Sequence, residues 1–112
     1  MNIYRIQDIH GVGPYWGKGS YEYDFLFWWA CQDHGYLPTP QSDGLIMLPG
    51  NICGFVSIDQ LENWFLDAEI TKLLNHGYVI KEVTIDQEFV QSSESQAVIE
   101  SSKIINSSTL CY

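Results

Sequence analysis

Positive charge is what this sequence has least of. Five lysine and arginine residues stand against 14 aspartate and glutamate residues, giving a formal net charge of −9, and Arg5 is the only arginine. Binding to nucleic-acid phosphates or to an anionic membrane needs clustered lysine and arginine, so this composition argues against both. A basic protein surface, of the kind that normally holds nucleic acid, would attract the chain.

Cysteines and apolar runs are also few. The three cysteines, Cys31, Cys53 and Cys111, are odd in number and widely spaced, and no CxxC or HxxxH pair is present. We therefore expect free thiols in a reducing compartment and no structural metal site. The chain opens with an alternating pattern rather than the apolar run of a signal peptide, and its longest apolar stretch, Phe25–Cys31, is too short to span a bilayer. These features predict a cytoplasmic protein that does not bind membranes.

Catalytic motifs are missing as well. The histidines His10, His34 and His76 stand in three separate contexts, none of them within a recognised catalytic motif. No pair of carboxylates with catalytic spacing stands out either. The sequence therefore favours a protein that is not an enzyme, with no catalytic residue and no cofactor.

A glycine-rich loop follows the first predicted strand. Residues His10–Ser20 include Gly17 and Lys18, as a phosphate-binding loop would, but the required GxxxxGK[ST] spacing is absent. Tyr15 and Trp16 lie in the middle of this loop. Aromatic side chains in such a place either bind a partner or fold back over the core.

The stretch Gly54–Ile85 predicts a strand, a helical segment and a second strand. Ser57 is a good helix N-cap, and Gln60 follows it at the spacing of a capping box. Two nearly opposite apolar stripes follow: Ile58, Leu61, Trp64, Phe65 and Ala68 on one face, and Leu66, Ile70, Leu73 and Leu74 on the other. We therefore predict a break near Leu66–Asp67, with Asp67 capping a second short helix; one straight helix buried on both sides is the alternative.

Further elements are predicted on both sides of this helical segment. Strand patterns occupy Asn2–Ile9, Cys53–Val56, Tyr78–Ile85 and Gln96–Ile99, with shorter candidates at Leu45–Leu48 and Lys103–Ile105. Gly77 fits the left-handed position that ends a helix. Both faces of Tyr78–Ile85 carry apolar residues, so we expect both faces to be at least partly covered. Tyr21–His34 has the spacing of a helix that is apolar nearly all round, and a buried strand is the alternative.

These elements predict an α+β (mixed α/β) fold. We expect the four longer strand segments to form one small twisted sheet, packed by the helical segments Tyr21–His34 and Ile58–Asn75. A chain of 112 residues, 46% of them hydrophobic, can bury one core, so residues 1–112 are expected to form a single domain. Its C-terminal segment, residues 91–112, is rich in serine.

Four acidic residues gather on and beside the predicted helical break. Asp59 and Glu62 fall on the outward face of the first helix, and Asp67 and Glu69 follow at the break, all within roughly 15 Å along the axis. Such a cluster is either a solvated helix face or a ridge that binds a partner.

A scattered pattern resembles a known group of proteins. It consists of Tyr4-Arg5, Gly11-Val12-Gly13-Pro14-Tyr15, Gly54-Phe55-Val56-Ser57, Leu61, Trp64-Phe65, Leu74, Gly77-Tyr78 and Ser95-Gln96-Ala97-Val98. The pattern spans roughly residues 1–99 and resembles short phage and prophage proteins without an assigned function. In size and acidity the chain also resembles anti-defence inhibitors, including anti-CRISPR proteins.

The order of three polar residues resembles the Arg–Ser–Glu layout of ADP-ribosyltransferases. In that family the arginine holds a dinucleotide phosphate, the serine orders the nicotinamide side, and the glutamate does the chemistry. Arg5, Ser57 and Gln96 would match these positions here. Because glutamine cannot carry the negative charge of the glutamate, the resemblance implies a degenerate, non-catalytic dinucleotide pocket.

The sequence therefore leaves three functional hypotheses. The preferred one is a phage-type, anti-CRISPR-like inhibitor that binds a basic host defence protein or nuclease complex in the host cytoplasm. Its expected contacts are Asp59, Glu62, Asp67, Glu69, Tyr15 and Trp16. The first alternative is the degenerate ADP-ribosyltransferase-like domain, with Arg5, Ser57 and Gln96 lining its pocket. The second is a homodimeric structural protein.

Overall fold

The computed structural model describes residues 1–13 and 40–112, and this part of the chain contains six strands and two α-helices. In chain order they are β1 (Asn2–Gln7), β2 (Asn51–Gly54), α3 (Ile58–Trp64), α4 (Asp67–Asn75), β3 (Val79–Ile85), β4 (Val90–Ser92), β5 (Ala97–Glu100) and β6 (Ile104–Leu110), with single 3₁₀ turns at Gln87–Phe89 and Ser101–Lys103. The predicted helix Tyr21–His34 lies outside the described residues. The α+β class is confirmed.

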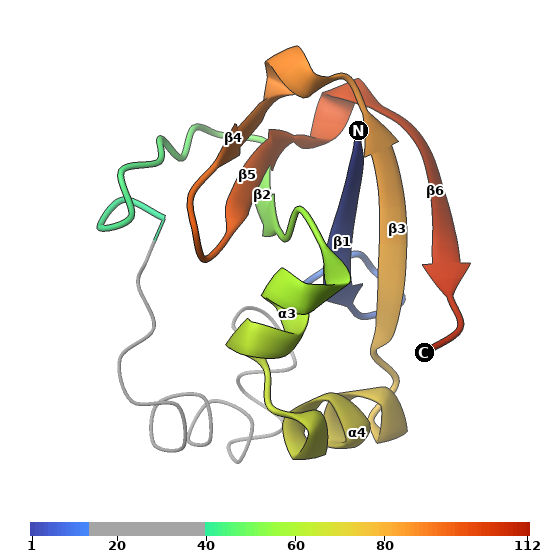
Figure 1. Ribbon diagram of the computed structural model, residues 1–112. Coiled ribbons are helices and arrows are strands. Elements are labelled where there is room, and N and C mark those ends of the chain that lie inside the picture. The colour runs from blue at the N-terminus through green and yellow to red at the C-terminus, as the bar shows by residue number, and fades with distance from the viewer. Residues whose placement is uncertain (14–39) are drawn as a thin grey trace.

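The strands form two antiparallel sheets, of order β1-β3-β6 and β2-β5-β4 (Figure 1). The prediction of one sheet was therefore wrong, because β1 and β3 belong to one sheet whereas β2 and β5 belong to the other. A bridge joins the two sheets: the backbones of Tyr4 and Phe55 exchange two N–H···O hydrogen bonds of 2.8 Å. The segment after β3 supplies one strand, β6, to the first sheet and two strands, β4 and β5, to the second.

In the central sheet, β1-β3-β6, the paired strands β1 and β3 contribute buried side chains on both faces. Side chains alternate along a strand, so Ile6 and Ile80 face one side while Ile3 and Val83 face the other. The first side packs with the helices in a cluster of Ile6, Phe55, Leu61, Trp64, Phe65, Ile70, Leu73, Tyr78 and Ile80. The second packs with the other sheet in a cluster of Ile3, Val83, Ile85, Ala97 and Ile99. The prediction that both faces of Tyr78–Ile85 are at least partly covered is confirmed.

The first helix begins as predicted, but Gln60 has a different role. The Ser57 Oγ accepts a hydrogen bond of 3.0 Å from the Gln60 backbone N–H. The Gln60 side chain does not complete a capping box with Ser57. Its Oε1 accepts from the Val56 N–H at 2.9 Å, and its Nε2 donates to the carbonyls of Ser93 and Glu94 at 3.1 and 2.9 Å. Gln60 therefore ties the start of α3 to the turn between β4 and β5.

The predicted break between two helices is confirmed, since α3 ends at Trp64 and α4 begins at Asp67. The cap of α4 differs from the prediction. Leu66 has the extended backbone of an N-cap, Asp67 is the first helical residue, and Glu69 Oε1 accepts the Leu66 N–H at 2.8 Å. The helix carboxylate that satisfies a free backbone donor is thus Glu69 rather than Asp67.

The end of α4 follows the predicted geometry. Gly77 has a φ of +88°, and the Tyr78 N–H donates to the Leu73 carbonyl at 3.1 Å. This bond closes a Schellman motif, in which glycine accepts the left-handed backbone without a Cβ clash. The motif directs the chain from α4 straight into β3.

Three segments differ from the strand predictions. Leu45–Leu48 is not a strand; its backbone pairs instead with the side-chain amide of Gln91, through Ile46 N–H to Oε1 at 2.9 Å and Nε2 to the Ile46 carbonyl at 3.0 Å. The predicted Lys103–Ile105 strand is the start of the longer β6. Strand β4 was not predicted, because its serine-rich surroundings give no apolar alternation.

We expect Trp64→Ala to lower the free energy of unfolding by about 3–5 kcal/mol. Trp64 is buried, and its ring lies 5.7 Å from that of Phe55, so truncation would leave a cavity between α3 and the sheet bridge. Thermal and chemical unfolding measure the effect. Asn63→Ala, at an exposed position on the same helix, is the matched control. Equal stability of the two variants would contradict this packing.

Candidate functional site

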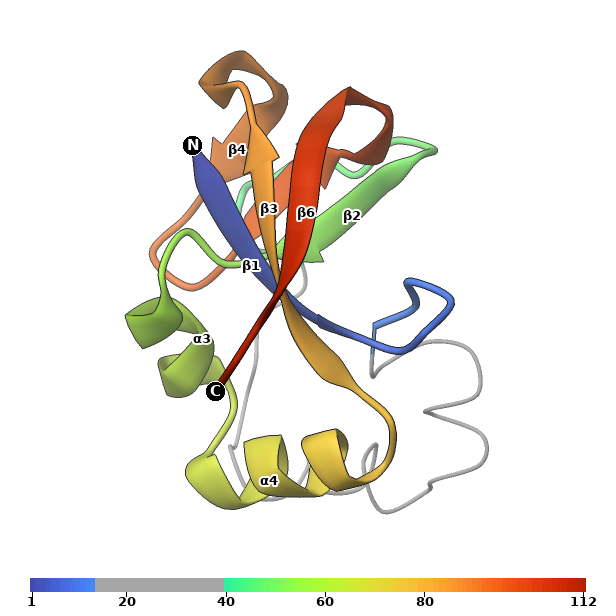
Figure 2. The same ribbon diagram turned by 90° about the vertical axis from the view of Figure 1, so that its right-hand side faces the viewer.

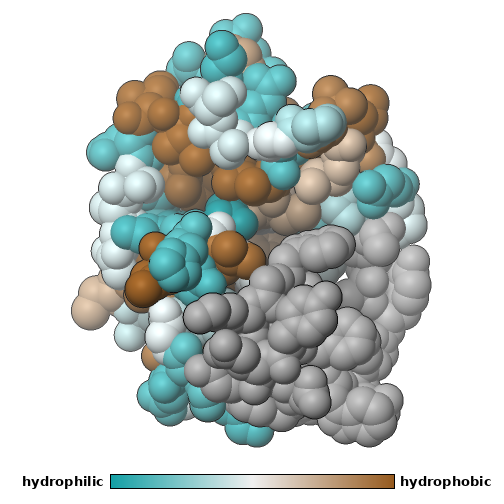
Figure 3. Space-filling model, turned by 180° about the vertical axis from the view of Figure 1, so that it is seen from behind, coloured by the Kyte–Doolittle hydropathy of each residue, from teal (hydrophilic) through white to brown (hydrophobic). Residues whose placement is uncertain are grey.

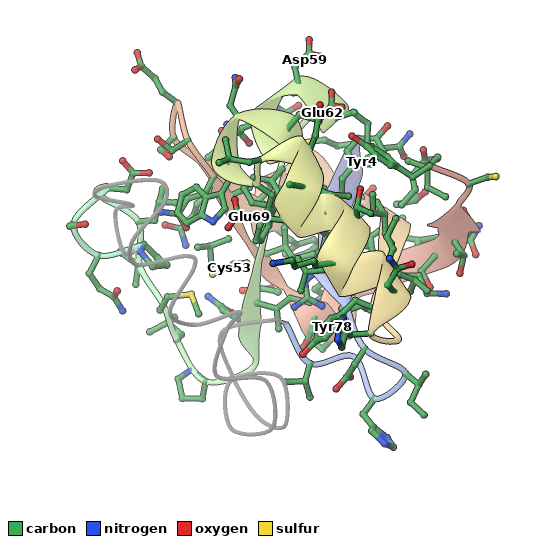
Figure 4. All side chains as sticks on the ribbon, turned by 90° about the horizontal axis from the view of Figure 1, so that it is seen from below. Tyr4, Cys53, Asp59, Glu62, Glu69 and Tyr78 are labelled. Carbon is green, nitrogen blue, oxygen red and sulfur yellow. The ribbon has the colours of Figure 1, made fainter. Side chains whose placement is uncertain are left out.

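The exposed carboxylates of the two helices form a surface that we call the acidic ridge: Asp59 and Glu62 on α3 and Asp67 at the start of α4. Figure 4 shows Asp59 and Glu62 on the outer side of α3 and Glu69 further in. Within residues 1–13 and 40–112, none of the three ridge carboxylates forms an ion pair with a cation. Among the described residues, the ridge is therefore a negative surface without a paired cation.

Glu69, the fourth predicted contact residue, is not part of the ridge. Only 3% of its surface is exposed, and its carboxylate caps α4 at the Leu66 N–H. Its spacing from Leu66 is that of the capping-box glutamate, but leucine has no side-chain oxygen to complete the box, so the sequence held only half of this signal. Tyr15 and Trp16, the predicted aromatic contacts, lie outside the described residues.

Tyr112 is a ridge residue that the sequence analysis missed. Its phenol donates a hydrogen bond to Glu62 Oε2, and Figure 2 shows the C-terminus beside α3. This hydrogen bond, with smaller contributions from burial and from the charges of Glu62 and Asp67, raises the pKa of Tyr112 to about 12. No local pattern places a C-terminal residue on a helix some 50 positions earlier in the chain, a separation that the fold alone brings together.

Arg5 is buried between the sheets, where it joins three parts of the chain. Its Nε donates to the Cys53 carbonyl at 2.6 Å, and its Nη1 donates to Gln7 Oε1 at 2.7 Å and to the Gly11 carbonyl at 3.3 Å. No carboxylate of the described residues pairs with it. Burial lowers the pKa of the guanidinium, opposed by Cys53, and burial also raises the pKa of the Cys53 thiol. Arg5 therefore acts as an internal brace of β1, β2 and the Gly11 turn.

The other two residues of the predicted dinucleotide pocket are also hydrogen-bonded within the fold. Ser57 caps α3, and Gln96 Nε2 donates to Asp43 Oδ2 at 3.2 Å. In these hydrogen bonds, Arg5, Ser57 and Gln96 have no partner in common. The contacts that the structure describes therefore do not join Arg5, Ser57 and Gln96 into one constellation.

A buried polar cluster fixes the turn between β4 and β5. The Ser93 hydroxyl hydrogen-bonds to Asp43 Oδ2 and accepts from the Gln96 backbone N–H at 3.1 Å, while Gln60 holds the turn from the helix side. This cluster was not predicted, because it links residues far apart in the chain. Serine and aspartate alone do not make a nucleophile and base, and His76 is engaged elsewhere, with Nδ1 2.6 Å from the Lys72 carbonyl.

The described part of the chain holds no cluster of His, Cys, Asp and Glu suited to a metal ion. No helix there is long and apolar enough to cross a membrane.

Exposed apolar side chains include Ile9, Ile46, Leu48 and Ile105. On the face drawn in Figure 3, the apolar atoms of the described residues surface in several separate places. The acidic ridge is thus the most distinctive surface of the described residues.

These features define a small α+β protein with an acidic helical surface. A family model described as Bacteriophage T4 Y00F protein matches residues 1–110, and the chain belongs to this family. The resemblance to phage proteins is confirmed at this level, while the residue pattern on which it was based stays a prediction. Searches of curated proteins and of solved structures find no match.

We expect Glu62→Gln to lower the pKa of Tyr112 from about 12 toward the ordinary value of about 10. A raised tyrosine pKa means that the folded state favours the protonated phenol, so the contact is intact below pH 10 and is lost as the pH rises toward 12. The ultraviolet absorbance of tyrosinate measures this titration, with Tyr112→Phe subtracted to isolate the one residue.

The matched control is Glu88→Gln, at an exposed site outside the ridge. This variant should leave the Tyr112 titration unchanged. A Tyr112 that titrates identically in the Glu62→Gln and wild-type proteins would show that the C-terminus does not rest on the ridge in solution.

Proposed function

We propose that this phage-family protein inhibits a host defence system by binding a basic protein or nuclease complex through its acidic ridge. The observation that carries the proposal is that Asp59, Glu62 and Asp67 are exposed on two short helices and form no ion pair with a described cation. The whole chain has a net charge of −9. Membership of a phage family supports a setting inside an infected cell.

The physical basis is competition with nucleic acid. Lysine and arginine that normally neutralise phosphates are attracted equally to carboxylates held on a rigid helical surface. The break after Trp64 matters here, since it lets two helices contribute acids to one surface. Each exposed ion pair is worth only about 0.2–1 kcal/mol, so the ridge acts by the sum of its charges and by steering the approach of the partner.

Tyr112 extends the ridge with an aromatic side chain that is half exposed and already positioned by Glu62. Tyrosine is among the residues that contribute most to protein interfaces. Tyr15 and Trp16 remain part of the proposal as aromatic contacts on the strength of the sequence alone. Glu69 supports the surface indirectly, by capping α4 beneath it.

No observation favours the dinucleotide alternative. Holding a dinucleotide phosphate would require the guanidinium of Arg5, which is buried and donates to two carbonyls and to Gln7. Gln96 is likewise held by Asp43. A ligand would have to break these hydrogen bonds before it gained any of its own.

We expect the combined change of Asp59, Glu62 and Asp67 to lysine to abolish inhibition. The matched control changes Asp86, Glu88 and Glu94 to lysine, which are exposed and lie outside the ridge, with the same change in net charge. The assay expresses each variant in host cells that carry a nuclease-based defence and counts plaques of a phage sensitive to that defence.

Wild-type protein and the control variant should restore plaque formation, and the ridge variant should not. Binding to the defence complex should also weaken as salt concentration rises, because the contacts are exposed charges. Equal activity of the two triple variants would remove the ridge from the function, and an absence of protection by the wild-type protein would refute the inhibitor proposal itself.

A further inference from the structure

Strand β6 lies at a free edge of the central sheet, whose order is β1-β3-β6 (Figure 2). The hydrogen-bond pattern shows which of its backbone groups point outward. The Ile85 N–H donates to the Met1 carbonyl at 3.0 Å, so the odd-numbered residues of β3 face β1 and the even-numbered residues face β6. Ser108 lies opposite Glu82 and therefore faces β3, whereas the N–H and C=O groups of Ser107 and Thr109 point away from the sheet.

Within residues 1–13 and 40–112, this edge lacks the features that normally protect edge strands. Proteins block such edges with charges, proline, bulges or a covering segment. Strand β6 has no charged residue and no proline, and its one irregularity lies at its start, opposite Thr84 and Ile85. Strand β4, at an edge of the other sheet, has another segment of the chain beside it: the side-chain amide of Gln91 pairs with the backbone of Ile46.

We propose that β6 pairs with β6 of a second copy of this chain, antiparallel across a two-fold axis at Ser108. In this register Ser107 lies opposite Thr109 of the partner subunit, and the reverse pair is equivalent by symmetry. Both residues offer outward N–H and C=O groups, so each pair exchanges two backbone hydrogen bonds. The result is one continuous six-stranded antiparallel sheet made of two central sheets.

The side chains of β6 are compatible with their own copies. Serine and threonine are small enough to lie opposite one another, and their hydroxyls hydrogen-bond across antiparallel strands. Ile105, 65% exposed in the single chain, would come beside the end of the partner strand and lose contact with water. An isologous pairing of this kind closes on itself and does not continue into a fibre.

Charge favours a second copy at this edge. Two molecules of net charge −9 repel one another, so close approach is least costly along a strand that carries no charge of its own. Strand β6 is uncharged, and two lysines offset the one acid that lies opposite it: Lys103 precedes the strand, Lys81 Nζ donates to Thr109 Oγ1 at 2.8 Å, and Glu82 lies opposite Ser108. A basic partner, by contrast, would be drawn to the acidic ridge, which uses other residues.

The decisive variant is Ser107→Pro. Proline removes an N–H that points away from β3, so the pairing of β6 with β3 should survive while the outward edge loses a donor. Ser107→Ala keeps the backbone donor and is the matched control. Sedimentation equilibrium over a range of protein concentrations measures the association, and circular dichroism melting verifies that each variant is folded.

We expect the wild-type and Ser107→Ala proteins to pass from monomer to dimer as concentration rises, and Ser107→Pro to associate about tenfold or more weakly. A folded Ser107→Pro protein that dimerises like the wild type would overturn the proposal. A wild-type protein that stays monomeric at all concentrations would also overturn the proposal. Binding of a different protein at the β6 edge of such a monomer would not rescue it.

A cross-link tests the register even where proline disturbs folding. Ser108→Cys in a Cys111→Ser background should oxidise to a disulfide-linked dimer, because facing residues of a non-hydrogen-bonded antiparallel pair have Cα atoms about 4.5 Å apart, within disulfide range. Ser102→Cys, exposed but outside the strand, is the control and should not form this dimer efficiently. Equal cross-linking at the two positions would overturn the register.

Discussion

The pairing of β1 with β3, buried on both sides, is the constraint on which the rest of the structure depends. Ile3 and Val83 face the second sheet, and Ile6 and Ile80 face the helices, so one antiparallel pair supplies both cores with side chains. The helices and the second sheet must then lie on opposite sides of it. This arrangement displays the ridge on the helical side and leaves β6 at the edge, where neither layer covers its outward backbone groups.

The parts of the fold that sequence could predict are those governed by neighbouring residues. Ser57, the break before Asp67 and Gly77 act within one helical turn, and all three are found where the local patterns placed them. The division into two sheets depends on which distant strands pair, and capping and periodicity carry no such information. Strand β6 was largely missed because residues 105–109 are exposed, which leaves no apolar alternation to detect.

The candidate site follows the same rule. The exposure of Asp59 and Glu62 follows from helical periodicity, since the apolar face of α3 fixes which residues point outward. Glu69 is buried rather than exposed, unlike the other acids. Its carboxylate accepts a hydrogen bond from the Leu66 N–H, which would otherwise lack an acceptor, and this bond offsets the cost of burying the carboxylate. Tyr112 and the Asp43–Ser93 contact join distant segments, so only the folded chain brings them together.

The burial of Arg5 connects the fold to the electrostatics of the surface. Arginine is the residue best suited to grip carboxylates, since its planar group donates two parallel hydrogen bonds. Here the single arginine is enclosed between the sheets, where carbonyl groups and Gln7 occupy its donors. The surface of the chain is therefore left without any guanidinium to neutralise the ridge, either on the same molecule or on a second copy. The burial of Arg5 thus leaves the ridge carboxylates open to the cations of the proposed partner, and the proposed pairing of β6 with a second copy uses backbone groups rather than charge.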